Sequence, residues 1–204
     1  MTMNIRVIII FPEICFLTDL VLNLVMRYDS EHNLKRDEPV NRIILFAGMA
    51  AALWLTLFKP LWRIGEIFLA GIFFSYLLLA SLVDIQTTQV YDFLHILGAL
   101  AGLLLCLLNR TLSEMAASIV LFWLVQRFLF SRMYGKADAK AFWVCALFEA
   151  GTGGGLKVYF MHMAAAFLLL SVVQVFRHNI NNKGNLIVPV PFLPYISITV
   201  LLFL

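Results

Sequence analysis

Long apolar runs recur along the chain, and they limit what it can fold into more than any other feature. The run at 64–83 is 20 residues long and holds one charged side chain, Glu66. A helix rises ~1.5 Å per residue, so this run matches the roughly 30 Å hydrocarbon core of a bilayer. With 62% hydrophobic and 13% charged residues in 204 positions, the chain has more apolar side chain than a water-soluble domain this size can cover. The sequence therefore predicts an all-helical, polytopic membrane protein.

About eight segments are expected, two of them short. The apolar segments lie at 5–26, 43–58, 64–83, 93–108, 115–130, 139–150 and 156–176, followed by a tail that ends at Leu204. The segment 139–150 has 12 residues, too few to span a bilayer alone, so we expect it to pack inside the bundle. Residues 1–60 are expected to form two amino-terminal helices and residues 61–204 a six-segment core, within one continuous membrane domain.

The first segment differs from a cleaved signal peptide. Glu13 and Asp19 interrupt it, and no small-residue cleavage site precedes Arg27, which indicates a retained first helix. Asp19 and Asn23 are one helical turn apart, so they share a face that we expect to point into the bundle. The polar run from Arg27 to Arg42 is expected to be a solvated loop.

Basic residues predict the topology. If the segments alternate, one side of the membrane collects ten of them and the other side five. The first group is Arg27, Lys35, Arg36, Arg42, Arg127, Arg132, Lys136, Lys140, Arg177 and Lys183; the second is Arg6, Lys59, Arg63, Arg110 and Lys157. Short cytoplasmic loops carry an excess of Lys and Arg, so the first side is predicted to be cytoplasmic and the amino terminus to lie outside.

Several classes of function are disfavoured. A net charge of +3, from 15 basic and 12 acidic residues in scattered loops, gives no indication of a nucleic-acid partner. Cys15, Cys106 and Cys145 lie in apolar segments without a Cys-x-x-Cys pair, which argues against a disulfide framework or a zinc site. His95 and His162 lack metal-ligand spacing and are expected to be bundle histidines. We expect no metal and no cofactor.

Two carboxylates at segment ends are the candidates for chemistry. Asp84 follows the third apolar segment and Asp138 precedes the short one, and alternation puts both at the predicted cytoplasmic edge. An aspartyl hydrolase needs one ionised carboxylate to take a proton from water and one protonated carboxyl to donate to the scissile carbonyl. Close carboxylates in a low dielectric cannot both ionise cheaply, so their titrations separate. The pair is therefore predicted to be a catalytic dyad, although Asp138 could simply cap the short helix and Asp84 could simply face water at a helix end.

The order of the motifs resembles a known family. Asp84 ends a segment and is followed by a polar connector, Gly135-x-x-Asp138-x-Lys140 comes two segments later, and Pro191-Phe192-Leu193-Pro194 precedes the last segment. In this order the chain resembles the type IV prepilin and preflagellin peptidases, over roughly residues 64 to 204.

The resemblance implies a function and a site. Members of the family that the chain resembles cut the leader from prepilin-like precursors at the cytoplasmic face of the prokaryotic plasma (inner) membrane. They use two catalytic aspartates, which correspond in this sequence to Asp84 and Asp138. Gly135, Ala137 and Lys140 would form the supporting motif around the second aspartate. Possible substrate-binding positions are Val90, Tyr91, Asp92, Pro191 and Pro194. The implied partners are a prepilin-like precursor as substrate and the lipid bilayer.

This chain departs from the family pattern at three places. Val90 fits the aliphatic position of the first motif, but Tyr91 and Asp92 stand where proline and asparagine are usual. Ala137 replaces a motif glycine, and alanine restricts the backbone at positive φ. The amino-terminal region with paired cysteines that accompanies methyltransfer is missing, so peptidase activity alone is expected.

Two alternatives remain open. Tyr91-Asp92 also resembles the Tyr-Asp of presenilin-like intramembrane proteases, in which case Asp92 would be the first aspartate. A non-enzymatic membrane protein, either a transporter subunit or a degenerate peptidase homologue in pilus assembly, would instead depend on Asp19 and Glu149. Lys140 could belong to the site or extend to the interface from a buried stem.

Overall fold

The computed structural model describes residues 3–28, 34–180 and 190–204, and within these ranges the chain is all-helical. The α-helices are α1 (Met3–Tyr28), α2 (Glu38–Phe58), α3 (Ile64–Thr87), α4 (Asp92–Asn109), α5 (Leu112–Phe128), α6 (Lys136–Gly151), α7 (Leu156–Ile180) and α8 (Leu193–Val200). A short 3-10 turn, η1 (Phe130–Arg132), follows α5. The expected segments are confirmed, whereas Lys183 and Pro189 and part of the expected 27–42 loop lie outside the described residues.

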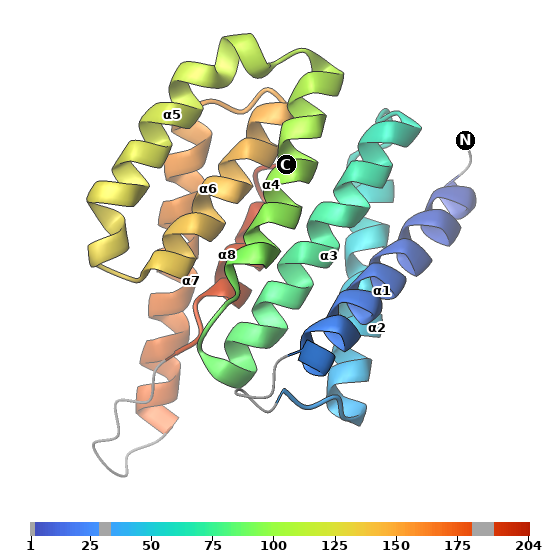
Figure 1. Ribbon diagram of the computed structural model, residues 1–204, viewed down its shortest axis with the longest axis vertical. Coiled ribbons are helices and arrows are strands. Elements are labelled where there is room, and N and C mark those ends of the chain that lie inside the picture. Colours follow the sequence, from blue (N-terminus) through green and yellow to red (C-terminus); the bar gives the residue numbers. More distant parts are fainter. Residues whose placement is uncertain (1–2, 29–33, 181–189) are drawn as a thin grey trace.

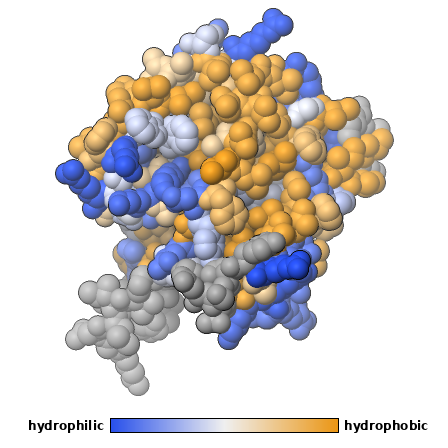
Figure 2. All heavy atoms as spheres, in the orientation of Figure 1, coloured by the Kyte–Doolittle hydropathy of each residue, from blue (hydrophilic) through white to orange (hydrophobic). Residues whose placement is uncertain are grey.

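The helices run up and down in one bundle (Figure 1). Six of those in the described ranges are long and apolar enough to cross a membrane, namely those from Ile5–Arg27, Glu38–Phe58, Ile64–Thr87, Asp92–Asn109, Leu112–Arg132 and Leu156–Phe176. Apolar side chains cover most of the face shown in Figure 2, while hydrophilic side chains gather toward its edges. Large exposed apolar residues on helices of this length indicate contact with lipid, so the protein is a multi-pass membrane protein.

Helix α3 is the centre of the bundle. It packs against α1, α2, α4 and α8, and 78% of its most apolar stretch is buried. In α5 only 17% of the most apolar stretch is buried, so this helix lies at the periphery and exposes its side chains to lipid. Asp84, in the last turn of α3, is therefore supported by packed neighbours on several sides.

Helices α4 and α6 form the closest helix pair. A Cβ atom on Gly102 of α4 would lie 2.9 Å from the backbone nitrogen of Phe148 in α6. Phe148 in turn stacks on Phe73 of α3, with ring centroids 4.0 Å apart. Small residues allow such an approach in membranes, where no hydrophobic force drives helices together. The 16-residue α6 is thus held inside the bundle, as its sequence length predicted.

Two helix ends differ from the expected boundaries. The third segment does not end at Asp84 but continues to Thr87, and it stops at Thr88, which adopts the left-handed conformation with φ 55°. The fourth begins at Asp92 instead of Phe93, so the connector shrinks to residues 88–91. Residues 84–87 are helical although three of the four are polar. In this last turn of α3, Asp84 is buried, whereas Ile85 and Gln86 are exposed.

The start of α6 also lies earlier than expected. The helix begins at Lys136, so Ala137 and Asp138 are in its first turn. Gly135 precedes the helix with φ 122°, a backbone conformation that favours glycine. The positive φ that favours glycine therefore occurs at Gly135. Ala137 has a helical backbone conformation, which accommodates its methyl group without strain.

The two amino-terminal helices belong to the same bundle as the rest. Helix α1 packs on both α2 and α3. Arg36, which follows α1, lies 2.6 Å from Asp19 and donates to Asn23 at 2.9 Å, so a single guanidinium bridges these two residues. Asp19 and Asn23 do share one face, as their spacing predicted. The expectation that this face points into the bundle is wrong, because Asn23 is exposed and the Asp19 side chain is 38% exposed.

Candidate active site

The candidate catalytic residues lie at one end of the bundle. The carboxyl end of α3 and the amino ends of α4 and α6 meet there, and α8 starts nearby within the bundle (Figure 1). Asp84 comes from the first of these elements and Asp138 from the third. The shared side predicted for the two aspartates is therefore present in the fold.

Asp84 is buried and held by the start of α8. Its side chain is 7% exposed, and its Oδ2 accepts a hydrogen bond from the backbone N–H of Leu193 at 3.0 Å. The backbone N–H of Phe192 is a second donor. Free N–H groups at a helix amino terminus favour a negative charge, so these contacts offset part of the cost of burying the carboxylate.

The flanking prolines explain why α8 starts at this point. Pro194 occupies the first turn of α8, where a missing N–H costs nothing and the fixed φ suits the helix. Pro191 precedes the two residues that donate to Asp84 and cannot itself donate. The Pro191 to Pro194 motif thus contributes backbone donors to the site, and both prolines are half-buried.

Asp138 is half-buried in the first turn of α6, outside the six candidate spans. Its Oδ2 points back over Gly135, where an added Cβ would lie 3.3 Å away. Burial, and to a lesser extent the charge of Asp84, raise the pKa of Asp138 to about 7. The two carboxyl groups therefore act on each other electrostatically, and Asp138 tends to keep a proton.

The two aspartates have unequal surroundings. Asp84 accepts backbone hydrogen bonds, whereas no hydrogen bond reaches the Asp138 side chain within the described residues. An ionised carboxylate beside a protonated carboxyl is the arrangement that general acid–base hydrolysis needs. The geometry suits Asp84 as the base and Asp138 as the acid.

An aromatic cluster surrounds this end of α6 and was not expected from the sequence. Tyr134, just before Gly135, packs edge-on against Phe142, Phe167 and Phe192, with ring centroids 5.8, 5.1 and 6.0 Å away. Its hydroxyl donates to Gln126 of α5. Burial raises the pKa of Tyr134, against the hydrogen bond to Gln126, and a charge on Asp138 raises it further. Its place immediately before the glycine motif was the signal available in the sequence.

Lys140 does not contact either candidate aspartate. Its Nζ lies 2.5 Å from Oδ1 of Asp92, the first residue of α4. This ion pair joins the first residue of α4 to the amino-terminal part of α6. The Asp92 side chain is 77% exposed, in contrast to buried Asp84. Val90 and Tyr91 are half-buried and pack against the hydrophobic core, so this part of the connector is held against the bundle.

A second buried acidic group pairs with a histidine. Glu149, near the end of α6, is 0% exposed, and its Oε1 lies 2.7 Å from Nδ1 of His162 in α7, which is 1% exposed. Neither oxygen of Glu149 meets full hydrogen-bond geometry, although the contact is close. The other ring nitrogen, Nε2, donates to the backbone carbonyl of Ile196 at 3.1 Å. The pair thus links α6, α7 and α8, and the spacing of the two residues in the sequence gave no sign of it.

The described residues contain no group of three or more His, Cys, Asp or Glu side chains that could hold a metal ion. Cys15, Cys106 and Cys145 are all free thiols. His95 bonds through Nδ1 to the hydroxyl of Tyr76 at 3.0 Å, the role expected of a bundle histidine.

Comparison with known proteins gives no assignment of family. No family model, no curated protein and no solved structure matches this chain.

Proposed function

We propose that this protein is a membrane aspartic endopeptidase that cleaves the leader of prepilin-like precursors at the cytoplasmic face of the membrane. The proposal rests on one observation above the others. Two carboxyl groups from different helices, Asp84 and Asp138, lie close enough at one end of the bundle that the charge of one raises the pKa of the other. The motif resemblance supplies the class of substrate.

In this mechanism Asp84 takes a proton from a water molecule, whose oxygen bonds to the scissile carbonyl carbon while Asp138 donates its proton to the carbonyl oxygen. The C–N bond then breaks as Asp84 passes its proton to the leaving nitrogen and Asp138 recovers its own from the hydroxyl. No covalent intermediate forms. The backbone donors of Phe192 and Leu193 keep Asp84 oriented, and the tyrosine and phenylalanines around Asp138 limit the access of bulk water. A helical peptide shields its own carbonyls by hydrogen bonding, so the substrate must be unwound at the leader junction.

The test is co-expression with a candidate precursor from the same genome, followed by separation of precursor and shortened product. Asp84→Asn and Asp138→Asn should each slow cleavage by about 100-fold or more, the scale of general acid–base catalysis. Glu38→Gln is the matched control, since it removes an exposed carboxylate at the same end of the bundle. Wild-type processing by both Asp84→Asn and Asp138→Asn would refute the assignment of the dyad.

The pH dependence gives a second measurement. Because burial and Asp84 raise the pKa of Asp138 to about 7, the proton that it donates is lost as pH rises through that value. We expect kcat/KM to decline above about pH 7. A rate that keeps rising through pH 9 would contradict the acid role of Asp138.

A presenilin-like protease that uses Asp92 predicts the opposite mutant pattern, with cleavage lost in Asp92→Asn and kept in Asp84→Asn. The exposure of Asp92 and its ion pair with Lys140 favour the first assignment.

A non-enzymatic membrane protein is the second candidate, and the buried Glu149–His162 pair is the observation that favours it. Ionisable groups inside a membrane bundle often serve ion or proton pathways. Absence of cleavage by the wild type on every pilin-like precursor of the genome would support this candidate.

A further inference from the structure

A cavity of about 260 Å³ opens between α5 and α6, on the side of α6 that faces away from α3. It is lined by Trp123, Gln126, Arg127, Ser131, Lys136, Ala139, Lys140 and Trp143. Three of these side chains are cationic, two are indoles, and none is acidic. The cavity lies at the same end of the bundle as Asp138, which stands between Lys136 and Lys140 in the first turn of α6.

The cations of this cavity are only partly neutralised. Lys140 pairs with Asp92, whereas Arg127 and Lys136 are exposed and make no ion pair within the described residues. The neighbouring polar groups are already engaged, since Ser131 donates to the carbonyl of Arg127 at 2.6 Å and Gln126 accepts a hydrogen bond from the hydroxyl of Tyr134. The cavity therefore has an excess of positive charge.

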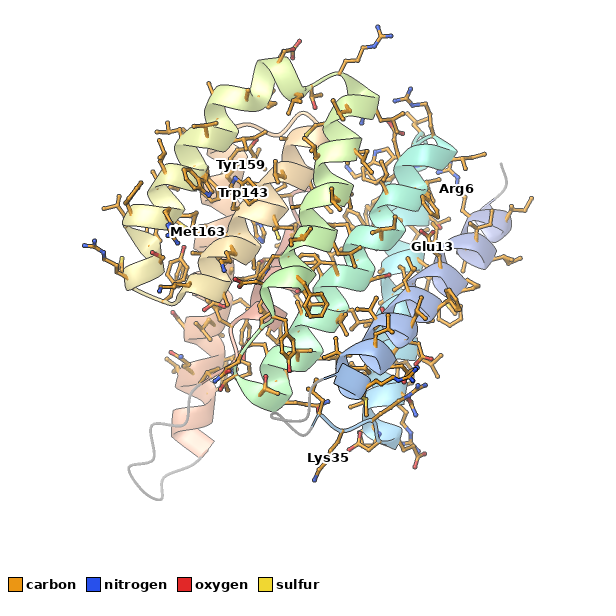
Figure 3. All side chains as sticks on the ribbon, in the orientation of Figure 1. Arg6, Glu13, Lys35, Trp143, Tyr159 and Met163 are labelled. Carbon is orange, nitrogen blue, oxygen red and sulfur yellow. The ribbon has the colours of Figure 1, made fainter. Side chains whose placement is uncertain are left out.

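An unpartnered hydrogen-bond donor belongs to another residue of the cavity lining, Trp143. The indole Nε1 of Trp143 is buried and has no hydrogen-bond partner within the described residues. Tryptophan nitrogen can only donate, so a matching ligand must offer an acceptor. Trp143 extends from α6 toward α5, in the region of the cavity (Figure 3).

The surroundings point to a lipid and not to a soluble anion. Helix α5 exposes Leu121, Leu124 and Phe128 on one face, with exposed fractions of 48%, 39% and 60%. None of these three residues lines the cavity, but they lie on the same helix as its lining residues Trp123 and Arg127. Indoles gather at the level of lipid headgroups, and basic pockets between helices on the cytoplasmic side are suited to anionic headgroups.

We propose that this cavity binds the phosphate headgroup of an anionic phospholipid. Arg127 and Lys136 contact the phosphate oxygens, Trp143 donates its N–H to an acceptor of the headgroup, and an acyl chain follows the exposed face of α5. The volume suits a headgroup alone, as whole drug-sized ligands occupy ~300 to 1,000 Å³. Neither Asp84 nor Asp138 lines this cavity, and the proposal stands whether or not the protein is a peptidase.

The test uses the full chain purified in mild detergent, mixed with phosphatidylglycerol or with phosphatidylcholine, and native mass spectrometry to count retained lipids. The wild type should retain phosphatidylglycerol in preference. Arg127→Gln combined with Lys136→Gln should weaken retention by roughly 10- to 30-fold, as expected for two basic side chains near a membrane surface. Trp143→Phe, which keeps the ring and removes the donor, should also weaken it.

The matched control is Arg110→Gln combined with Lys157→Gln, which removes two exposed positive charges at the other end of the bundle. This control should retain phosphatidylglycerol like the wild type. Equal loss in both double variants, or equal retention of the two lipids by the wild type, would overturn the proposal. Thermal stabilisation by inorganic phosphate without retention of phosphatidylglycerol would identify a soluble-anion site and would overturn it as well.

Discussion

At the scale of single residues, Asp84 and Asp138 lie at the same end of the bundle, but their surroundings differ in how well they stabilise a charged carboxylate. Asp84 accepts hydrogen bonds from backbone N–H groups at the start of α8, whereas Asp138 is half-buried and accepts none within the described residues. Aligned peptide dipoles favour a charge, and apolar surroundings disfavour one. The difference in environment, not the residue type, decides which carboxyl keeps its proton.

This difference predicts a pH-dependent gain in stability for Asp138→Asn. The pKa of Asp138 is raised to about 7 in the folded protein, so the native state binds the proton more tightly than the unfolded chain does. The wild type therefore loses stability as pH rises from about 4 to about 7, whereas the neutral asparagine does not. We expect the variant to be more stable at pH 8 by up to about 4 kcal/mol, the free-energy equivalent of moving a pKa from about 4 to about 7, and the gain to vanish near pH 4.

Thermal or denaturant unfolding in detergent at both pH values measures this effect. Glu114→Gln, at an exposed position in the first turn of α5, is the control and should shift little at either pH. A gain in Asp138→Asn that is equal at pH 4 and pH 8 would show that charge burial is not its cause.

The Glu149–His162 pair predicts a large cost for losing one partner. Glu149→Ala leaves the His162 ring without its partner at a site with no access to water, and breaking such a buried pair costs about 3–5 kcal/mol. The exposed Glu38–Arg42 pair on α2 is the matched comparison. Glu38→Ala should cost less than about 1 kcal/mol. Comparable losses of unfolding free energy in the two variants would contradict the structural role of the buried pair.

At the scale of helices, segment number and type followed from hydropathy, because each long apolar run had to satisfy its own backbone in lipid. The exact ends did not follow. Thr88 stops α3 through a left-handed backbone conformation, and a polar stretch such as 84–87 has no composition that separates helix from loop. Gly135 was assigned to the motif, but only the structure shows that the positive φ lies there and not at residue 137.

The partners of the motif residues were also beyond the sequence. Lys140 could equally extend to the interface or belong to the site, and its contact with Asp92 depends on the packing of α4 against α6. The Tyr134 cluster depends on residues from α6, α7 and the start of α8, which lie far apart in the chain. Linear spacing contains no signal for such contacts.

The close approach of α4 and α6 predicts that Gly102 cannot be enlarged. In Gly102→Ala the new methyl group would lie 2.9 Å from a backbone nitrogen, which cannot move like the end of a side chain. Overpacking of this kind costs about 1–3 kcal/mol and outweighs the gain of up to ~1 kcal/mol in helix propensity.

Gly155→Ala is the control for this helix contact. Nothing lies within 4 Å of a Cβ at Gly155, and its φ is not positive, so its unfolding free energy should stay near that of the wild type. Equal stability of Gly102→Ala and the wild type would mean that α4 and α6 are farther apart than the structure places them.

At the scale of the whole molecule, the described helices alternate in direction, so the loops divide between two ends. The turn between α2 and α3 lies at one end, and the turn between α5 and α6 lies at the end that holds Asp84 and Asp138. The excess of basic residues at the second end predicts that it faces the cytoplasm. Labelling one exposed position in each of these two turns can therefore show which end of the bundle faces the cytoplasm.

Two exposed residues are suitable for cysteine substitution. Leu61, in the turn between α2 and α3, is 93% exposed, and Met133, in the turn between α5 and α6, is 76% exposed. A membrane-impermeant maleimide added to intact cells should label Leu61→Cys and leave Met133→Cys unlabelled until the membrane is opened. The unsubstituted chain is the control, because Cys106 and Cys145 are buried and Cys15 lies within the span Ile5–Arg27. Labelling of Met133→Cys from outside would invert the topology, and the dyad would then face away from any precursor whose leader lies in the cytoplasm.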